Sequence, residues 1–158
     1  MSQQQRLLIY TDGASRGNPG PGGYGIVLIW GEVKKELSAG YRLTTNNRME
    51  LLAVIKALES LNRTGLHITI YTDSKYIVDS VQKGWLKTWI ATDFKGGKKN
   101  KDLWLLYNSL ATQHHIRFQW VKGHASNALN NRCDELATRA ADGHQLLTDH
   151  IYEREQGK

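Results

Sequence analysis

The sequence predicts a mixed α/β fold (α+β mixed) in which five strands form one sheet and helices cover its faces. Three apolar runs lie within the first 41 residues with only turns between them, a spacing typical of antiparallel hairpins. Two later apolar runs are separated by helical stretches, which favours parallel additions to the same sheet. The 158 residues, 40% of them hydrophobic and only 2 of them proline, suffice for one core of ordinary size.

The first half of the chain is expected to form a three-stranded meander and then a helix. Runs of β-branched and aromatic residues place strands at 6–11, 24–30 and 33–41. The stretch 12–25, rich in glycine and proline, is expected to be a tight connection. The helix follows because apolar residues recur at helical spacing: Leu51, Val54, Ile55, Leu58 and Leu61.

The second half is expected to alternate strands and helices. The strands are predicted at 67–72 and 117–121, and the helices at 74–83, 101–113 and 129–141. Residues 1–141 would form one domain, and the polar tail 142–158 is expected to fray at its end, although Ile151 and Tyr152 could dock. In sheets of this kind ligands tend to bind beyond the carboxyl ends of the central strands, so the residues that follow those strands are the first candidates for a site.

Composition argues against several classes of protein. The longest apolar runs, such as 7–10 and 26–30, are far shorter than the ~20 residues that a membrane span needs. Polar residues precede the first apolar run, so no signal peptide is expected. The only cysteine, Cys133, can form neither an internal disulfide nor a cysteine-based zinc site. These features fit a reducing compartment, and we expect a cytoplasmic protein with no membrane partner.

The net charge of +6 suggests a polyanionic partner, and it is concentrated in the segment 83–101. Six lysines stand there against one acid, Asp93, which gives a local net charge of +5. Basic residues interleaved with aromatic ones suit a nucleic-acid backbone and its sugars, but a solvated face above buried tryptophans fits equally well. The residues concerned are Lys83, Trp85, Lys87, Trp89, Phe94, Lys95, Lys98, Lys99 and Lys101.

Two predicted strands end in the same tetrapeptide, Ile9-Tyr10-Thr11-Asp12 and Ile70-Tyr71-Thr72-Asp73. If the strands are parallel neighbours, the two aspartates lie side by side at one edge of the sheet. Each aspartate also has an ordinary structural explanation. Asp12-Gly13 is a common turn dipeptide, and Asp73 or Ser74 is a common helix N-cap.

Two further acids stand near helix starts, where Glu50 could complete a capping box with Asn47 and Asp134 could meet a helix dipole. If all four acids converge, each like-charge pair at about 4 Å costs on the order of 4 kcal/mol, and cations are needed to balance the charge. Ligation by oxygen alone favours Mg²⁺, and then Mn²⁺, over zinc. Two such ions ~4 Å apart suit the cleavage of a phosphodiester.

Several blocks of sequence, in this order, resemble type 1 ribonuclease H over about 7–141. They are Thr11-Asp12-Gly13, Gly17-Asn18-Pro19-Gly20-Pro21-Gly22-Gly23-Tyr24-Gly25, Thr44-Thr45-Asn46-Asn47-Arg48-Met49-Glu50, Thr72-Asp73-Ser74, Trp120-Val121-Lys122-Gly123-His124-Ala125 and Arg132-Cys133-Asp134-Glu135-Leu136-Ala137. The resemblance implies a ribonuclease H-like fold and an endonuclease that hydrolyses the RNA strand of RNA–DNA hybrids. It further implies two Mg²⁺ ions, with Mn²⁺ as a substitute, and products with 5′-phosphate and 3′-hydroxyl ends.

The resemblance also implies roles for individual residues. Asp12, Glu50, Asp73 and Asp134 match the metal-binding acids, and His124 matches a loop histidine credited with proton shuttling or product release. Asn18, Asn46 and Asn47 match positions near the sugar edge, where 2′-hydroxyls distinguish RNA from DNA. Thr45 matches a contact to a phosphate of the DNA strand. The segment 83–101 stands in the place of a basic protrusion that grips this strand. Its candidate contacts are Lys83, Trp85, Lys87, Trp89, Lys95, Lys98 and Lys99.

The chain departs from the family pattern in three places. The protrusion is shorter and less basic, Leu43 stands where an arginine is expected, and Asn130-Asn131 stand where a glutamate is common. We therefore expect weaker hybrid binding with a shallower salt dependence. The residues leave other functions open: a DNA nuclease, transposase or junction resolvase with the same acids, a reverse-transcriptase ribonuclease domain, or a non-catalytic hybrid-binding module. The first Met and the length favour a stand-alone enzyme, expected to be a monomer.

Overall fold

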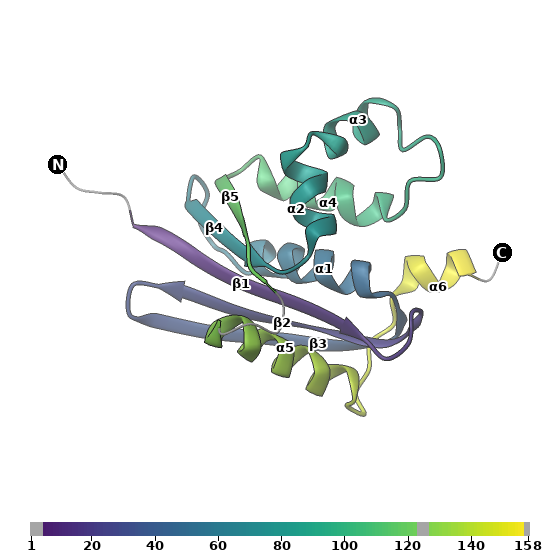
Figure 1. Ribbon diagram of the computed structural model, residues 1–158, viewed down its shortest axis with the longest axis horizontal. Coiled ribbons are helices and arrows are strands. Elements are labelled where there is room, and N and C mark those ends of the chain that lie inside the picture. The colour runs from purple at the N-terminus through teal and green to yellow at the C-terminus, as the bar shows by residue number, and fades with distance from the viewer. Residues whose placement is uncertain (1–4, 123–126, 157–158) are drawn as a thin grey trace.

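The computed structural model describes residues 5–122 and 127–156 and contains the expected five-stranded mixed sheet (Figure 1). Its strands are β1 (Arg6–Ser15), β2 (Gly20–Trp30), β3 (Val33–Thr44), β4 (His67–Thr72) and β5 (His115–Trp120), in the spatial order β3-β2-β1-β4-β5. The helices are α1 (Asn46–Glu59), α2 (Lys75–Gln82), α3 (Trp85–Ala91), α4 (Lys101–Ala111), α5 (Ala128–Ala141) and α6 (His150–Gln156). The predicted fold class is confirmed.

The stretch 12–25 differs from the prediction, because most of it is strand and only a short turn remains as connection. β1 extends to Ser15 and pairs antiparallel with β2, so that Asp12 lies opposite Gly25. Two glycines of this stretch, Gly23 and Gly25, allow close packing against α5. A Cβ on Gly25 would lie 2.2 Å from the carbonyl oxygen of Cys133, so only glycine lets the helix backbone approach the strand this closely.

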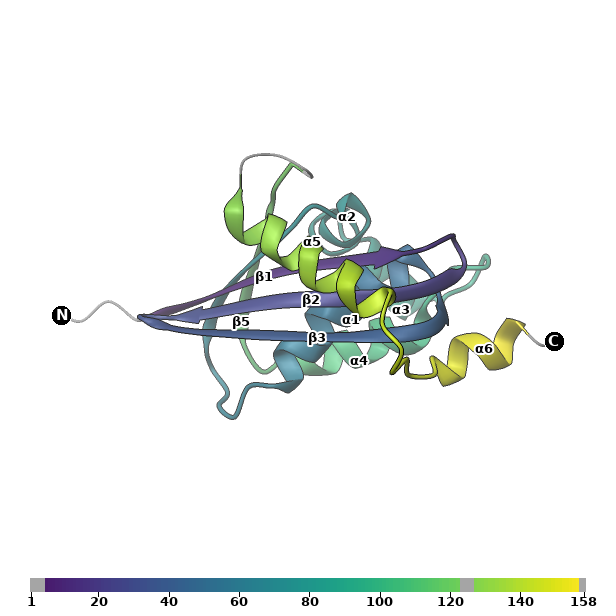
Figure 2. The ribbon, with the colours of Figure 1, turned by 90° about the horizontal axis from the view of Figure 1, so that it is seen from below.

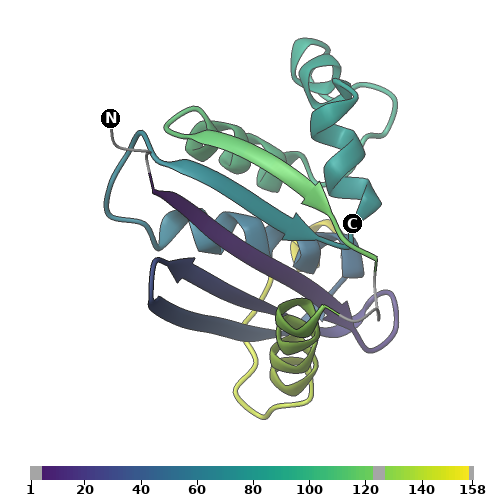
Figure 3. The same ribbon diagram turned by 60° about the vertical axis from the view of Figure 1, so that its left-hand side comes forward.

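β4 and β5 extend the sheet beyond β1, and both run parallel to it (Figure 3). In the β1–β4 register Tyr10 lies opposite Tyr71, and the two rings stack with their centroids 4.3 Å apart. Asp12 and Asp73 each follow these tyrosines by two residues and therefore come at the same level of the sheet. The repeated tetrapeptides predicted this arrangement.

Helices cover the two faces of the sheet differently. α1 packs on β1 and β2 on one face, and α4 packs against α1. α5 crosses β1, β2 and β3 on the opposite face and leaves β4 and β5 uncovered there (Figures 2 and 3). The main core lies between the sheet and α1, where Ile9, Ile26, Ile55 and Ile70 have no exposed surface. Within residues 5–122 and 127–156, no helix combines the length and the apolar character needed to cross a bilayer.

Two short helices were not predicted. α3 lies within the basic segment and buries only Leu86, and α6 lies in the tail and has no fully buried side chain. Each helix has only seven residues, which is too short for periodicity to identify. The tail reaches α6 along β3, where the backbone N–H of Leu147 donates to Gly40 (2.8 Å) and its carbonyl accepts from Arg42 (2.9 Å). This part of the tail is thus paired and helical, and the fraying expected at the end of the tail stays a prediction.

A buried arginine fastens the tail to α1. Arg48 donates all five of its N–H groups to oxygens of Asn100, Asp102 and Asp149, with N···O distances of 2.7–3.3 Å. Asn100 and Asp102 belong to the start of α4, and Asp149 directly precedes α6. One guanidinium therefore joins α1, α4 and the tail. Thr44 adds a hydroxyl hydrogen bond to Asp149 (2.8 Å).

Candidate active site

Asp12, Glu50 and Asp73 meet at one edge of the sheet. One carboxylate oxygen of each lies within 4.8 Å of the corresponding oxygens of the other two. Asp12 belongs to β1 and Asp73 directly follows β4, while Glu50 comes from α1 above them. Three acids that are far apart in the sequence thus form one cluster.

Close packing of α1 on β1 delivers Glu50 to the two aspartates. A Cβ on Gly13 would lie 2.4 Å from the backbone nitrogen of Glu50, so only glycine admits the helix at this distance. The Gly13 N–H donates both to the Glu50 carboxylate (2.5 Å) and to Oδ1 of Asp12 (2.9 Å). The Asp12-Gly13 dipeptide is therefore part of a strand under a helix and not a turn.

None of the three acids caps a helix. α1 is capped by Thr45, whose hydroxyl oxygen accepts a first-turn backbone N–H (3.2 Å), and the capping box of Asn47 with Glu50 is not formed. α2 is capped by Ser74, whose hydroxyl oxygen accepts a backbone N–H in the same way (3.3 Å). The carboxylates of Glu50 and Asp73 are therefore available for another purpose.

Burial and mutual repulsion make protonation of this cluster favourable. Asp12 and Glu50 are each only 5% exposed. Burial, followed by the charge of Asp73, raises the pKa of Asp12 to about 8. Burial and the charges of Asp12 and Asp73 also raise the pKa of Glu50 well above its ordinary value. Near neutral pH the cluster therefore holds protons unless a cation replaces them.

The donor set fits a hard divalent cation. The three ligand atoms are all carboxylate oxygens, and no histidine or cysteine belongs to the group within the described residues. Oxygen-only sets bind Mg²⁺, Mn²⁺ or Ca²⁺ in preference to softer metals. A cation would also balance the repulsion that raises the pKa values of Asp12 and Glu50.

Asp134 lies beside this cluster. The pKa of Asp12, raised mainly by burial and by the charge of Asp73, is raised further by the charge of Asp134, so the two side chains lie near each other. Asp134 is nevertheless outside the set of three mutually close oxygens. Asn127 caps α5, and Asp134 is the seventh residue of this helix, beyond the first turn where the helix dipole acts most strongly. The remaining predicted catalytic residue, His124, lies outside the described residues.

The backbone at Asp73 is held by an aromatic neighbour from β5. The indole Nε1–H of Trp120 donates to the carbonyl oxygen of Asp73 (3.2 Å). The ammonium nitrogen of Lys75 lies 4.6 Å from the centroid of the Trp120 ring, a cation–π contact. Trp120 is 38% exposed and thus borders both the acidic cluster and solvent.

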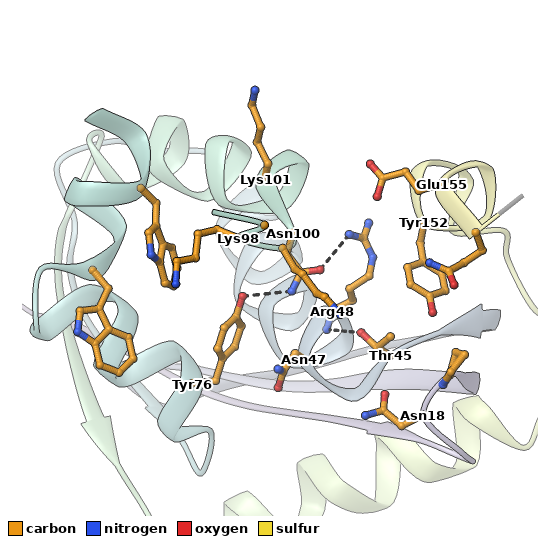
Figure 4. Close-up of a pocket in the computed structure, with 16 residues that line it drawn as sticks. Asn18, Thr45, Asn47, Arg48, Tyr76, Lys98, Asn100, Lys101, Tyr152 and Glu155 are labelled. Atoms are coloured by element: carbon orange, nitrogen blue, oxygen red, sulfur yellow. Dashed lines mark hydrogen bonds between the residues drawn. The ribbon is translucent and has the colours of Figure 1, made fainter. Parts of the chain in front are cut away.

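A groove of about 1070 Å³ opens next to the first turn of α1 (Figure 4). Asn47 lines the groove, and Glu50 follows one helical turn later in α1, so the groove lies next to the acidic cluster. The predicted substrate residues in the lining are Asn18, Thr45, Asn47, Trp85, Trp89, Lys98 and Lys99. The others, Asn46, Lys83, Lys87 and Lys95, are not in the lining, although the Asn46 backbone N–H donates to Oδ1 of Asn18 (3.1 Å).

The basic segment 83–101 combines features of the two interpretations offered by the sequence, a nucleic-acid contact surface and a solvated face above buried tryptophans. Trp89 packs against Trp104 and Phe94, with ring centroids 6.0 and 6.3 Å apart, as expected of a tryptophan beneath a solvated face. Trp85 and Trp89 both line the groove, but Trp85 is the more exposed, at 42%, as expected of a nucleic-acid contact. The two tryptophans therefore have different roles.

Some lysines of this segment are already partnered within the protein. Lys101 pairs with Asp93 (2.7 Å). Lys83 pairs with Asp79 (3.7 Å) and lies above the Trp85 ring. Lys98 and Lys99 are exposed in the groove lining and are the strongest candidates for a bound anion.

Sequence reasoning missed part of the groove. Tyr76, Asn100, Tyr152, Glu155 and Gln156 also line it. The Tyr76 hydroxyl accepts hydrogen bonds from Trp104 (2.8 Å) and Asn100 (3.1 Å), an arrangement without a sequence signal. For the tail the signals were the side chains of Ile151 and Tyr152. Tyr152 does dock: its ring centroid is 5.7 Å from the guanidinium carbon of Arg48.

Comparison with known proteins gives consistent matches over nearly the whole chain. The RNase H family profile matches residues 4–142. A ribonuclease H of Syntrophus aciditrophicus (strain SB) is 51% identical over 153 residues, covering 94% of this chain and 88% of the relative. A ribonuclease H of Trichodesmium erythraeum (strain IMS101) is 50% identical over 155 residues, covering 96% of this chain and 98% of the relative.

Solved structures with the same fold agree with these matches. LC9-RNase H1, described as a type 1 RNase H with the type 2 active-site motif, superposes with a TM-score of 0.82 at 29% identity, covering 100% of this chain and 83% of that one. LC11-RNase H1, solved in complex with an RNA/DNA hybrid, superposes with a TM-score of 0.66 at 27% identity, covering 86% of this chain and 96% of that one.

Proposed function

This chain belongs to the RNase H family, and from that premise we propose that Asp12, Glu50, Asp73 and Asp134 carry out its hydrolysis of the RNA strand in RNA–DNA hybrids. The observation that supports this assignment best is the cluster of three carboxylates whose oxygens lie within 4.8 Å of one another. The activity itself follows from membership of the family, in which the curated relatives are ribonucleases H.

The acids would hold divalent metal ions, and we propose Mg²⁺, with Mn²⁺ as a substitute. When bound, such ions supply Lewis acidity, which orients an attacking water and balances charge on the departing 3′ oxygen. Asp12 is the central ligand in this proposal, because Glu50, Asp73 and Asp134 all act on its pKa. The products would carry 5′-phosphate and 3′-hydroxyl ends. His124 is proposed to assist by moving a proton or by helping the product to leave.

Asn18, Asn46 and Asn47 are proposed to read the RNA strand. Asn18 and Asn47 border the groove, and Glu50 follows Asn47 by one turn of α1. The reacting phosphate would lie at the acidic cluster. Amide side chains beside that cluster could then bond the neighbouring 2′-hydroxyl, which DNA lacks. Discrimination between the RNA strand and the DNA strand would then depend on α1, the helix that also presents Glu50.

The groove is proposed to take the DNA strand. Thr45 can donate its hydroxyl hydrogen to a phosphate while its oxygen still caps α1, and Lys98 and Lys99 supply positive charge. Arg48 also lines the groove, but its five N–H groups are bonded within the protein, so we assign it no phosphate. Trp85 offers an apolar surface to the sugars.

The test is incubation of the chain with an end-labelled RNA–DNA hybrid, double-stranded RNA and double-stranded DNA, with and without Mg²⁺. We expect the RNA strand of the hybrid to be cut only when the metal is present. Cleavage of double-stranded DNA would instead favour a DNA nuclease. Binding of the hybrid without cleavage would favour a non-catalytic module.

Three expectations of the sequence analysis remain proposals: a monomer in solution, action in the cytoplasm, and a catalytic domain that ends at about 141. A monomer agrees with a cluster whose three acids come from a single chain. The tail beyond 141 does more than extend this domain, because Asp149 completes the hydrogen bonding of Arg48 in α1.

A further inference from the structure

The tail helix α6 contributes one wall of the groove. Tyr152, Glu155 and Gln156 all line it, at the i, i+3 and i+4 positions of one helix face. Figure 4 shows Tyr152 and Glu155 projecting from α6 on the side of the groove opposite Tyr76. This wall is separate from the basic segment and from the first turn of α1, which carry the proposed contacts to the hybrid.

A buried ion pair directly before its first turn holds α6 in place, and a more exposed pair within the helix adds little. Asp149, directly before α6, bonds the buried Arg48, and Glu153 forms a two-pronged pair with Arg42 of β3 (2.9 Å). The Tyr152 ring lies against the Arg48 guanidinium. The groove-facing residues of α6 are thus presented from a fixed position.

The charge of this wall is opposite to that of the rest of the groove. Among the described residues of the lining, the cationic ones are Arg48, Lys98, Lys99 and Lys101, and Glu155 is the only acid. Glu155 is exposed and forms no ion pair within 5–122 and 127–156. A phosphate entering the groove would therefore meet one uncompensated carboxylate.

Tyr152, unlike Glu155, can attract a phosphate that enters the groove. Its hydroxyl end is directed towards the side of the groove where Thr45 and Asn18 lie (Figure 4). A phenol hydroxyl can donate to a phosphate oxygen, and hydrogen bonds to charged acceptors are stronger than neutral ones. The ring itself stays packed on Arg48 whether or not the hydroxyl is occupied.

We propose that α6 is a third binding wall for the DNA strand of the hybrid, where Tyr152 donates to a backbone phosphate and Glu155 limits affinity by repelling it. The inference rests on the proposed function, because it assumes that a hybrid occupies the groove. Repulsion by one exposed carboxylate lowers affinity without touching the carboxylates that carry out the chemistry. α6 therefore sets how long the hybrid stays bound and leaves the cleavage step unchanged.

Glu155→Gln, Tyr152→Phe and the control Glu153→Gln separate these effects. Glu153→Gln removes the same charge from the same helix, but outside the groove lining. For each variant KM and kcat are measured on an RNA–DNA hybrid with Mg²⁺, and Kd by fluorescence anisotropy of the labelled hybrid in EDTA. We expect Glu155→Gln to bind about two- to fivefold more tightly at low salt, a gain that shrinks as salt is added. Tyr152→Phe should bind about tenfold more weakly.

In both groove variants kcat should remain that of the unmodified chain, and Glu153→Gln should match the unmodified chain in Kd. Equal tightening by Glu155→Gln and Glu153→Gln would overturn the proposal, since net charge and not position would then explain it. Unchanged Kd and KM in both groove variants would also overturn it, while normal cleavage would leave the proposed function intact. Failure of the unmodified chain to cut the hybrid would instead contradict the proposed function.

Discussion

Asp12 is the residue on which the acidic cluster depends most. It is buried, it accepts the Gly13 N–H, and three other acids raise its pKa or contact it. In the absence of metal this carboxyl gains a proton on folding, because its pKa rises from 3.8 to about 8. The stability that this proton provides is fully present below a pH of about 4 and is lost as the pH rises through about 8.

Asp12→Asn should therefore abolish cleavage and stabilise the metal-free protein in alkaline buffer. Cleavage should fall by at least ~10³-fold, because a metal ligand is removed. Asn keeps an acceptor for the Gly13 N–H, so the fold should persist. Thermal melting in EDTA should show a Tm advantage of the variant that grows from about pH 4 to about pH 8 and then levels off, since over this range the Asp12 carboxyl is ionised in the unfolded chain and protonated in the folded one.

Asp79→Asn is the matched control, since Asp79 pairs only with the exposed Lys83. It should leave cleavage and the pH dependence of Tm unchanged. An unfolded Asp12→Asn variant would mean that Asp12 is chiefly structural. A Tm difference that did not vary with pH would contradict the protonation described here.

At the scale of single elements, α5 depends on the absence of side chains in the sheet beneath it. Cβ atoms on Gly23, Gly25 and Gly40 would lie 2.5, 2.2 and 2.1 Å from carbonyl oxygens of α5. The helix therefore rests on strand backbone, and its distance from the sheet fixes where Asp134 stands relative to Asp12.

Gly25→Ala should displace α5 and weaken both stability and cleavage. We expect a loss of about 2–3 kcal/mol in the free energy of unfolding, since overpacking of a close contact costs this much. Urea unfolding measures the loss, and the cleavage rate reports the displaced Asp134. Gly143→Ala, where the nearest atom is 3.3 Å from the added Cβ, should have a much smaller effect. Similar losses in the two variants would argue against the close contact at Gly25.

The attachment of α6 depends on a different interaction, the buried carboxylate of Asp149. Asp149→Ala should lower the free energy of unfolding by about 3 kcal/mol, because Arg48 would remain buried with part of its charge unpaired. Glu153→Gln, which breaks the more exposed pair with Arg42, should change stability little. Urea unfolding of the two variants tests this order, and a larger loss in Glu153→Gln would contradict it.

At the scale of the whole molecule, positive charge and the acidic cluster occupy adjacent regions. Lys98 and Lys99 line the groove, whereas Lys34 and Lys35 lie near the opposite end of β3 from the groove residue Thr45. Binding of a polyanion should therefore depend on which lysines are removed and not only on how many.

Lys98→Ala combined with Lys99→Ala should raise KM for the hybrid at moderate salt and leave kcat nearly unchanged. The slope of log affinity against log salt concentration should become shallower by up to about 2, one unit for each phosphate that the variant no longer neutralises. Lys34→Ala combined with Lys35→Ala removes the same charge elsewhere and should have little effect. A loss confined to kcat in the groove variant would contradict a binding role.

The sequence was sufficient for the sheet and for the acidic cluster because their signals are local. Apolar runs mark the strands, and the repeated Ile-Tyr-Thr-Asp words set two aspartates at one level once the strands are parallel. Glu50 and Asp134 were candidates because they stand near predicted helix starts, and the resemblance to ribonuclease H matched all four acids to metal ligands. The extension of β1 through Gly13 was missed, because glycine usually indicates a turn and its packing role becomes visible only with α1 and α5 in place.

The α6 wall could not be predicted for a different reason. Its position depends on a contact between Arg48 and Asp149, which are 101 residues apart, and it has no apolar repeat of its own. A seven-residue helix held by one buried ion pair resembles a polar tail in sequence. Long-range polar contacts of this kind are specified by the completed fold.

The hydrogen bond from Trp120 to the carbonyl of Asp73 gives the acidic cluster an optical reporter. Indole emission responds to the local electric field, and this indole is partly exposed beside a residue proposed to bind metal. Titration with Mg²⁺ should therefore alter the intensity or wavelength of fluorescence without any nucleic acid present. Trp120→Phe should remove that response, since it removes the indole that bonds Asp73. Metal occupancy and substrate binding could then be followed as separate events.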